Sequence, residues 1–228
     1  VAGVMPRWPL IVYACLIVLM GLRDKCVFLA SRPEQYVPTM LCFALFIDFH
    51  DAIIAAKIFI VIVWMGAGVS KLQNGFPATV AIMVQNTPWN VFRKLRLATV
   101  RDYPNDLRPS KFTHLLAHVG GTTAEIVVPL TLLFSPWPWL TWVAIVSIWM
   151  LHTFILSTIP LAVPLEWNVF FMFCAGFLFG NFSAGDGYGV FDMQPLLLAG
   201  VLFVALAPIV LGAFKPQYVS FLIGMKQY

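Results

Sequence analysis

The sequence has few charged residues. Only 11% of its 228 residues are Asp, Glu, Lys or Arg, whereas 61% are hydrophobic. Soluble proteins average about 25% charged and about 45–50% apolar residues, so this composition excludes a disordered chain and an ordinary soluble domain. A mean hydropathy of +0.87 indicates an integral membrane protein. At about 20 residues per transmembrane helix, the chain has room for one membrane domain of roughly six to eight helices.

Cysteines and cofactor motifs are also scarce. The four cysteines form no CxxC pair and no Cys/His group with zinc spacing, so we expect ordinary buried apolar side chains. The sequence contains no phosphate-binding loop. No signal-peptide pattern opens the chain, which begins Val1-Ala2-Gly3-Val4, and we expect it to be part of a longer protein.

Apolar runs, by contrast, fill most of the chain. They predict an all-α, polytopic integral membrane helix bundle with about seven transmembrane segments. The last five runs are long enough, or nearly so, to cross about 30 Å of hydrocarbon, whereas the first two are short. The predicted spans lie near residues 8–22, 36–49, 52–72, 114–134, 137–158, 164–180 and 195–214.

Lysine and arginine set the predicted orientation of these spans. They gather in residues 90–111, after the first span (Arg23, Lys25 and Arg32) and in the C-terminal tail. Seven alternating spans place all three regions on one side, which the positive-inside rule makes cytoplasmic. We therefore expect a multi-pass protein of the bacterial inner (plasma) membrane with a cytoplasmic C-terminus and a flexible outer loop at 181–194. The basic loop 90–111 fits simple anchoring or contact with anionic lipid, and no nucleic-acid partner is expected.

Several polar residues fall inside the predicted spans, although a charge at mid-bilayer costs roughly 2.5–3.5 kcal/mol on insertion. Lys57 lies toward the outer half. The others, His114 among them, converge on the cytoplasmic half of the bundle, with Glu125 reaching mid-depth. The candidate site residues are Lys71, Glu125 and His152 as catalytic groups, and His118, Glu166, Asn168, Gly66 and Ser70 as ligand-binding groups.

Helical periodicity predicts that His114, His118 and Glu125 share one face, because spacings of four and seven residues leave offsets of about 40° and 20°. Two histidines at this spacing can ligate a metal, but no HExxH or repeated Glu-x-x-His is present, and we predict no metal site. A hydrogen-bonded polar seam and a site that handles protons or substrate both stay open.

The stretch from Trp64 to Leu72 is the most specific. Gly66 and Ser70 form a pair of small residues four apart, which lets another helix approach closely. Lys71 would then lie at a tight helix contact, where desolvation can turn a lysine into a base. The alternative is a snorkelling lysine that only anchors the helix end.

Four stretches resemble an uncharacterised bacterial, mainly actinobacterial, polytopic membrane family. The likeness covers nearly the whole chain and corresponds to the C-terminal half of family members, which have no assigned activity. The stretches are Gly21-Leu22-Arg23-Asp24-Lys25, the run from Ala55-Ala56-Lys57 through Ser70-Lys71-Leu72, Asp106-Leu107-Arg108-Pro109 and residues 164–170.

A more distant resemblance concerns Ala67-Gly68-Val69-Ser70-Lys71-Leu72. It is similar to the Ala-Gly-x-x-Lys-Leu motif of the vitamin K-dependent gamma-glutamyl carboxylase superfamily and its horizontally transferred transmembrane domain. The resemblance implies that Lys71 is a base acting on a hydroquinone, that His152 ends a similar helix and that Glu125 is the acidic residue of the next helix. The lumenal domain of the carboxylase is not matched, so glutamate carboxylation is not implied.

Two functions follow as hypotheses. The first is a membrane protein that handles a lipophilic ligand, an isoprenoid quinone or a lipid, as an acid–base or redox enzyme with Lys71 as base. The second is a non-catalytic structural or accessory subunit that contacts other membrane subunits and membrane lipids. A transporter is a weaker interpretation, because no inverted repeat is visible.

Overall fold

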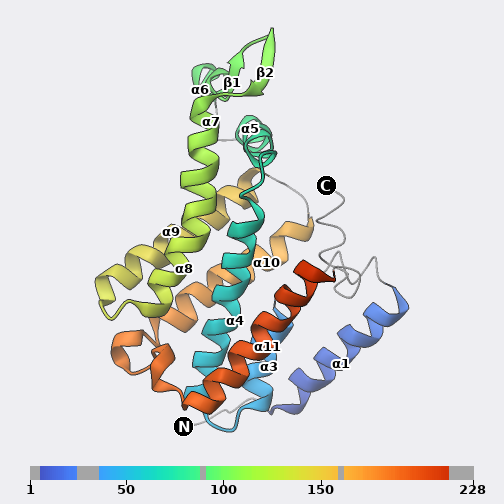
Figure 1. Cartoon of the computed structure of the whole chain (residues 1–228), viewed down its shortest axis with the longest axis vertical. Coiled ribbons are helices and arrows are strands. Elements are labelled where there is room, and N and C mark those ends of the chain that lie inside the picture. The colour runs from blue at the N-terminus through green and yellow to red at the C-terminus, as the bar shows by residue number, and fades with distance from the viewer. Residues whose placement is uncertain (1–5, 25–35, 88–90, 159–161, 216–228) are drawn as a thin grey trace.

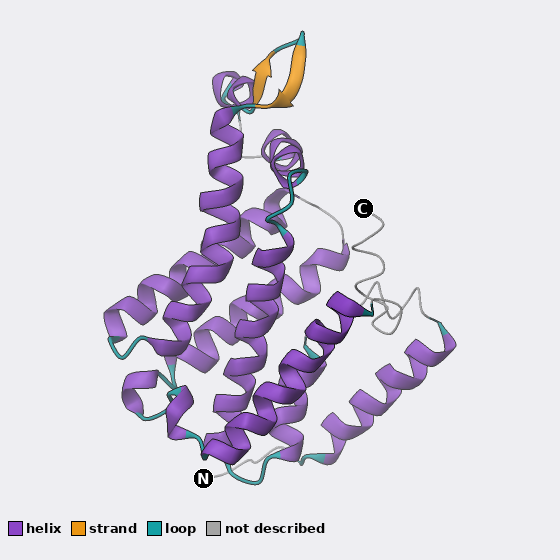
Figure 2. Cartoon of the chain, in the orientation of Figure 1, coloured by secondary structure: helices purple, strands orange, loops and turns teal. Residues whose placement is uncertain are grey.

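A computed structural model describes residues 6–24, 36–87, 91–158 and 162–215, with no side chains described at 162–166 and 212–213. Helices dominate this part of the chain, and two short strands form a hairpin at one end (Figure 2). The α-helices are α1 (Trp8–Arg23), α3 (Val37–Leu45), α4 (Phe49–Ser70), α5 (Phe76–Asn86), α6 (Arg93–Ala98), α7 (Lys111–Leu115), α8 (Ala124–Phe134), α9 (Pro138–Thr158), α10 (Ala162–Cys174) and α11 (Pro195–Phe214).

Four helical stretches of the described residues are long and apolar enough to cross a membrane. They are Phe49–Ser70, Lys111–Phe134, Pro138–Thr158 and Trp167–Asp186, while Trp8–Arg23 and Pro195–Leu211 are apolar but shorter. The fold is thus an all-α membrane protein, and the predicted count of about seven spans is not confirmed. The predicted span at 36–49 is only the nine-residue α3, because Phe46 turns extended and Asp48 then caps α4.

Helix α4 forms the centre of the bundle (Figure 1). It packs against α3, α8 and α11, and the residues Ala52–Ile58 are almost completely inaccessible. Its sequence is apolar nearly all round, as expected for a helix surrounded by others. The α4 side chains therefore point into protein on most sides, and any polar group on them needs a partner there.

The segment from Lys111 to Phe134 is one continuous helix with an irregular middle. Eight residues, Leu116–Thr123, adopt the wider π-helical conformation, labelled η2, between α7 and α8. A π-helical segment turns less per residue than an α-helix, so it changes the angular relation between residues before and after it. The prediction that His114, His118 and Glu125 share a face assumed an uninterrupted α-helix. The rings of His114 and His118 do lie side by side, 6.2 Å apart, but η2 precedes Glu125, which is buried whereas His114 is exposed.

The predicted basic loop is an ordered element. Residues 91–111 contain α6 and the antiparallel strands β1 (Val100–Asp102) and β2 (Asp106–Pro109), with Val100 opposite Pro109. Ser110 closes the hairpin onto the membrane helix, because its side chain accepts from the Thr113 N–H. In Figure 1, α5 and α6 are seen nearly end-on above α4 and α7, so they run across the direction of those helices.

The predicted flexible outer loop at 181–194 is likewise structured. It contains two short 3-10 helices, η4 (Ala184–Asp186) and η5 (Val190–Asp192), joined through Gly187, whose φ of 84° favours glycine. The Ser183 hydroxyl donates to Asp186 at 2.6 Å, and the Gly189 N–H donates to Asp192 at 2.7 Å. Of the predicted basic residues near the first span, Lys25 and Arg32 lie outside the described residues.

Candidate functional site

Three polar side chains lie along one stripe of α4 and its C-cap residue, Lys71. Lys57, Trp64 and Lys71 follow one another at intervals of seven residues, each offset by about 20° on an α-helix. At about 1.5 Å per residue, Lys57 and Lys71 are separated by roughly 21 Å along the helix axis. Each of the three has its own polar partner on another part of the bundle, so the stripe joins three polar contacts at different depths.

The Lys71 end of the stripe holds an ion pair. The Lys71 ammonium donates to Oε2 of Glu125, the second residue of α8. The Glu125 side chain is only 4% exposed and that of Lys71 is 23% exposed. The Phe76 ring covers the ammonium at 5.6 Å, a cation–π distance. The carboxylate is therefore enclosed, and the Lys71 side chain is partly exposed.

A glycine allows α4 and α8 to approach closely enough for this pair. An added Cβ at Gly68 would lie 2.8 Å from Ile126 Cγ1 and 3.2 Å from Glu125 Cβ. At Gly66, a Cβ would meet nothing within 4 Å. The predicted close contact at Gly66 and Ser70 therefore occurs one helix face away, at Gly68. Ser70 instead donates to the Ala67 carbonyl at 2.7 Å.

The middle of the stripe carries a hydrogen-bonded histidine. The Trp64 indole N–H donates to His152 Nε2 at 3.0 Å, and His152 Nδ1 lies 2.6 Å from Asn168 Oδ1. An indole nitrogen only donates, so Nε2 must be an acceptor and the imidazole must be neutral. The proton then sits on Nδ1 and is donated to Asn168. All three side chains are buried.

Aromatic rings surround this histidine. Phe171 lies 5.5 Å from the His152 ring and 5.7 Å from the Trp64 ring, and Phe179 lies 6.3 Å from Trp64. Trp64, which donates to His152, lies seven residues before Lys71 on the same stripe. The structure thus places Lys71, Glu125, His152 and Asn168 in neighbouring contacts of one bundle interior, as two clusters and not as one hydrogen-bonded chain.

The other predicted site residues lie apart from these clusters or cannot be placed. His118 is half-buried on η2, with its ring 6.2 Å from that of the exposed His114. Glu166 belongs to α10, but its side chain lies outside the described residues. Among the described residues, no three His, Cys, Asp or Glu side chains come together in a way that could hold a metal ion.

The sequence prediction omitted Lys57 and Trp64 from the site. Lys57 is buried, and its ammonium donates to the carbonyls of Phe182 and Tyr188, the latter at 2.9 Å. The rings of Phe179 and Tyr188 flank it at 5.3 and 5.9 Å. The spacing of seven between Lys57, Trp64 and Lys71 was the available signal, because it places the three residues on one face.

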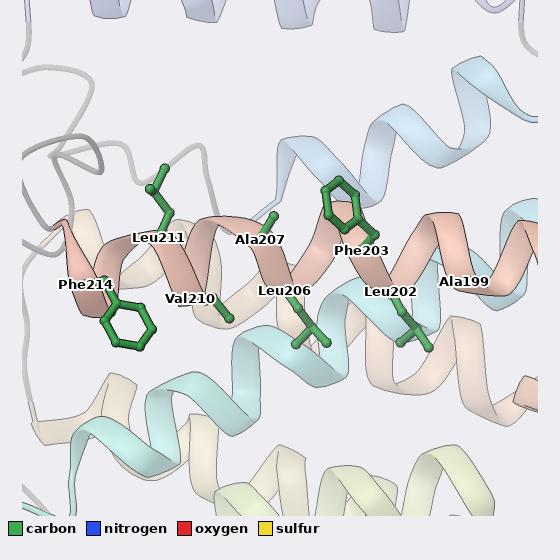
Figure 3. A pocket seen from close by; sticks show the side chains of 8 residues that line it. All are labelled: Ala199, Leu202, Phe203, Leu206, Ala207, Val210, Leu211 and Phe214. Atoms are coloured by element: carbon green, nitrogen blue, oxygen red, sulfur yellow. The ribbon is translucent and has the colours of Figure 1, made fainter.

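A separate apolar groove runs along α11 (Figure 3). None of the predicted site residues lines it, and it presents only apolar side chains. It is therefore a feature of the bundle surface and not of the polar stripe. The lining residues are Ala199, Leu202, Phe203, Leu206, Ala207, Val210, Leu211 and Phe214.

Comparisons with known proteins give a single finding. Residues 1–228 match the family described as "Transmembrane protein of unknown function (DUF3556)". No curated protein and no solved structure matches the chain.

Proposed function

Because the chain belongs to this family of transmembrane proteins of unknown function, we propose its function from its own residues: it handles a lipophilic ligand, an isoprenoid quinone or a lipid, by acid–base chemistry at Lys71. The observation that carries the proposal is the Lys71–Glu125 pair. A buried carboxylate and a partly accessible ammonium form a unit that can exchange a proton with a hydroxyl group arriving from the membrane.

The proposed proton exchange is balanced within the pair. The ammonium gives a proton to Glu125 Oε2, and the resulting neutral amine takes the hydroxyl proton of the ligand. The ligand leaves this step as an anion beside the re-formed ammonium, and no electron is transferred. The surrounding low-polarity interior strengthens the attraction between that anion and Lys71. The likeness of residues 67–72 to the carboxylase motif supports Lys71 as the base.

His152 and Asn168 take the role of positioning groups in this proposal. The Trp64 bond fixes the imidazole orientation, and Trp64 lies seven residues before Lys71 on the same stripe. His118, Glu166, Gly66 and Ser70 remain proposed ligand contacts.

The first experiment is native mass spectrometry of the protein extracted in mild detergent. The expected result is a retained lipophilic mass, identified as a quinone or a polyprenyl lipid. The double variant Lys71→Met/Glu125→Gln removes both charges while keeping the side-chain volumes similar, and it should lose the ligand with little change in melting temperature. Lys57→Met is the matched control and should keep the ligand. Equal ligand retention in the double variant and the wild type contradicts the proposal.

A structural or accessory subunit is the second candidate. It is favoured by exposed aromatic side chains such as Phe173, which is 63% exposed and stacks on Phe177 at 5.5 Å. Large apolar surface in a membrane protein can face lipid or a partner helix. Stable co-migration with other subunits on a native gel, without a bound lipophilic mass, would favour this candidate over the first.

We also propose that the end bearing α5, α6 and the hairpin is cytoplasmic, in a bacterial plasma membrane. Arg93, Lys94 and Arg96 lie at this end, while Asp186 and Asp192 lie at the opposite end, which follows the positive-inside rule. A cysteine introduced at Asn105 should react with a membrane-impermeant reagent only after the cells are opened. Labelling in intact cells would instead indicate that this end of the protein faces the outside of the cell.

A further inference from the structure

One surface combines basic and apolar side chains outside the polar stripe. Residues 91–111, here called the basic platform, hold six Lys or Arg and two Asp residues. No residue of α6 is buried. Large apolar side chains stand exposed among the charges, including Phe92 at 69% and Leu107 at 63%. Such an alternation is typical of elements that lie in a membrane interface.

The position of the platform along the membrane helix sets its depth. The candidate span Lys111–Phe134 ends at Phe134, and about 20 residues, or roughly 30 Å, of helix counted back from there reach Leu115. The hairpin begins to leave the helix at Ser110. The platform therefore lies about one helical turn beyond the hydrocarbon, at the level of the lipid headgroups.

The orientation of the elements agrees with this depth. Figure 1 shows α5 and α6 running across the direction of α4 and α7, as helices that lie flat on a bilayer do. Helix α5 is buried on one side through Val80 and Val84 and exposes Ile82. The Thr113 hydroxyl donates a hydrogen bond to the Thr99 carbonyl at 2.7 Å, and this bond holds the platform to the end of the membrane helix.

The charges of the platform are not neutralised within the described residues. The carboxylate of Asp106 is paired with the Arg108 guanidinium, and the carboxylate of Asp102 accepts a hydrogen bond from the Asn105 side chain. Arg93, Lys94 and Arg96 have no acidic partner in the part of the chain that the structure describes. Three unpaired cations on one exposed turn, at headgroup depth, are complementary to phosphate groups of anionic lipid.

We propose that the basic platform binds anionic phospholipid headgroups of the bilayer that holds the protein. Arg93, Lys94 and Arg96 meet the lipid phosphates, and Phe92 and Leu95 insert at the boundary with the acyl chains. This proposal does not depend on the function proposed for Lys71. The occupant is lipid and not a soluble protein, because the platform lies at headgroup depth and its helices lie flat.

The test is hydrogen exchange of the full chain in two nanodisc preparations. One contains phosphatidylcholine alone, and the other also contains phosphatidylglycerol at roughly one part in three. Amides of residues 91–110 should exchange about tenfold more slowly in the anionic discs, and about 0.5 M salt should remove the difference through screening. The 181–194 segment at the opposite end is the internal control and should exchange equally in both.

The triple variant Arg93→Gln/Lys94→Gln/Arg96→Gln should lose the effect of anionic lipid, whereas Lys215→Gln, at the exposed end of α11, should keep it. Equal exchange of residues 91–110 in both discs overturns the proposal, as does a slowing that high salt leaves unchanged. Slowing that occurs only after a cytosolic protein fraction is added also overturns it, since a protein would then be the occupant. The salt series on the wild type decides the matter even if the triple variant fails to fold.

Discussion

Helix α4 and its C-cap residue supply two lysines with different surroundings. Lys57 is 1% exposed, and its ammonium is bonded to the neutral carbonyls of Phe182 and Tyr188. Lys71 is partly exposed and is paired with the carboxylate of Glu125. Backbone carbonyls cannot take up a proton, whereas a carboxylate can. The same residue type on the same stripe thus holds a loop at one end and pairs with a titratable carboxylate at the other.

This difference separates structural from chemical roles more clearly than burial does. The more deeply buried lysine donates to two backbone carbonyls, and it holds the 181–194 segment against α4. The less buried lysine has both a proton acceptor and an open side. Access together with a titratable partner therefore makes Lys71 the candidate for chemistry.

The largest expected effect on stability comes from breaking the Lys71–Glu125 ion pair. Lys71→Met leaves the Glu125 carboxylate buried without a counter-ion and should cost about 4 kcal/mol of stability. The apparent melting temperature in detergent, followed by tryptophan fluorescence, measures this loss. The double variant Lys71→Met/Glu125→Leu should recover most of it, because no unpaired charge remains. A single variant as stable as the wild type would show that the pair carries no charge.

The next effect tests whether the Lys71 end depends on close helix contact. Gly68→Ala forces Ile126 and the backbone at Thr122 away from α4 and should cost about 3 kcal/mol, since overpacking against backbone is poorly relieved. Gly66→Ala is the matched control and should leave the melting temperature nearly unchanged, because its Cβ meets open space. Equal effects of the two variants on the melting temperature would show that close approach of α4 and α8 at Gly68 does not determine stability.

Breaking the hydrogen bonds of Lys57 should have a smaller and more local effect on stability. Lys57→Met leaves the carbonyls of Phe182 and Tyr188 without their donor and should cost about 2 kcal/mol, because the loss is partly offset by no longer burying a charge. Hydrogen exchange should accelerate in residues 181–194. The amides around Glu125 serve as the control and should not change. Acceleration spread evenly over the bundle would show that the Lys57 contacts do not stabilise the 181–194 segment specifically.

The smallest effect concerns an ion pair in water. The Arg108 guanidinium beside Asp106 lowers the pKa of that carboxyl from 3.8 to about 2. A depressed pKa means that the contact stabilises the hairpin above pH 4 and is lost as the pH falls through 2. Asp106→Asn should abolish this dependence without moving the bundle melting temperature, as exposed pairs contribute little. The pH dependence of this contact is measured from the amide chemical shifts of the hairpin in an NMR titration. Equal pH-dependent changes in amide shifts throughout the bundle would contradict an effect confined to the hairpin.

Composition and apolar runs predicted an all-α membrane protein, because a bilayer demands long apolar helices. The span count depended on breaks that composition does not mark. Asp48 ends one apolar run and caps the next helix, so one predicted span became the short α3. The hairpin at 100–109 also escaped prediction, since its strands are only three and four residues long.

The candidate site was predictable in part. Lys71 and Glu125 were both selected from their cost in a membrane, and the structure brings them into contact. Their pairing could not be read from the sequence, because 54 residues separate them and the π-helix η2 sets which way Glu125 faces. Trp64 was missed because the seven-residue spacing that places it between Lys57 and Lys71 does not show that its N–H has a polar partner.

The two lysine contacts of α4 have a further consequence for how the helix can move. Lys57 ties the helix to the 181–194 segment and Lys71 ties its C-terminal end to α8, at points roughly 21 Å apart along the helix axis. A helix held to two different neighbours at separate points cannot slide along its axis or turn about it without breaking at least one of these contacts. The two lysines therefore set the register of α4 within the bundle, and a sliding motion would leave a buried polar group without its partner.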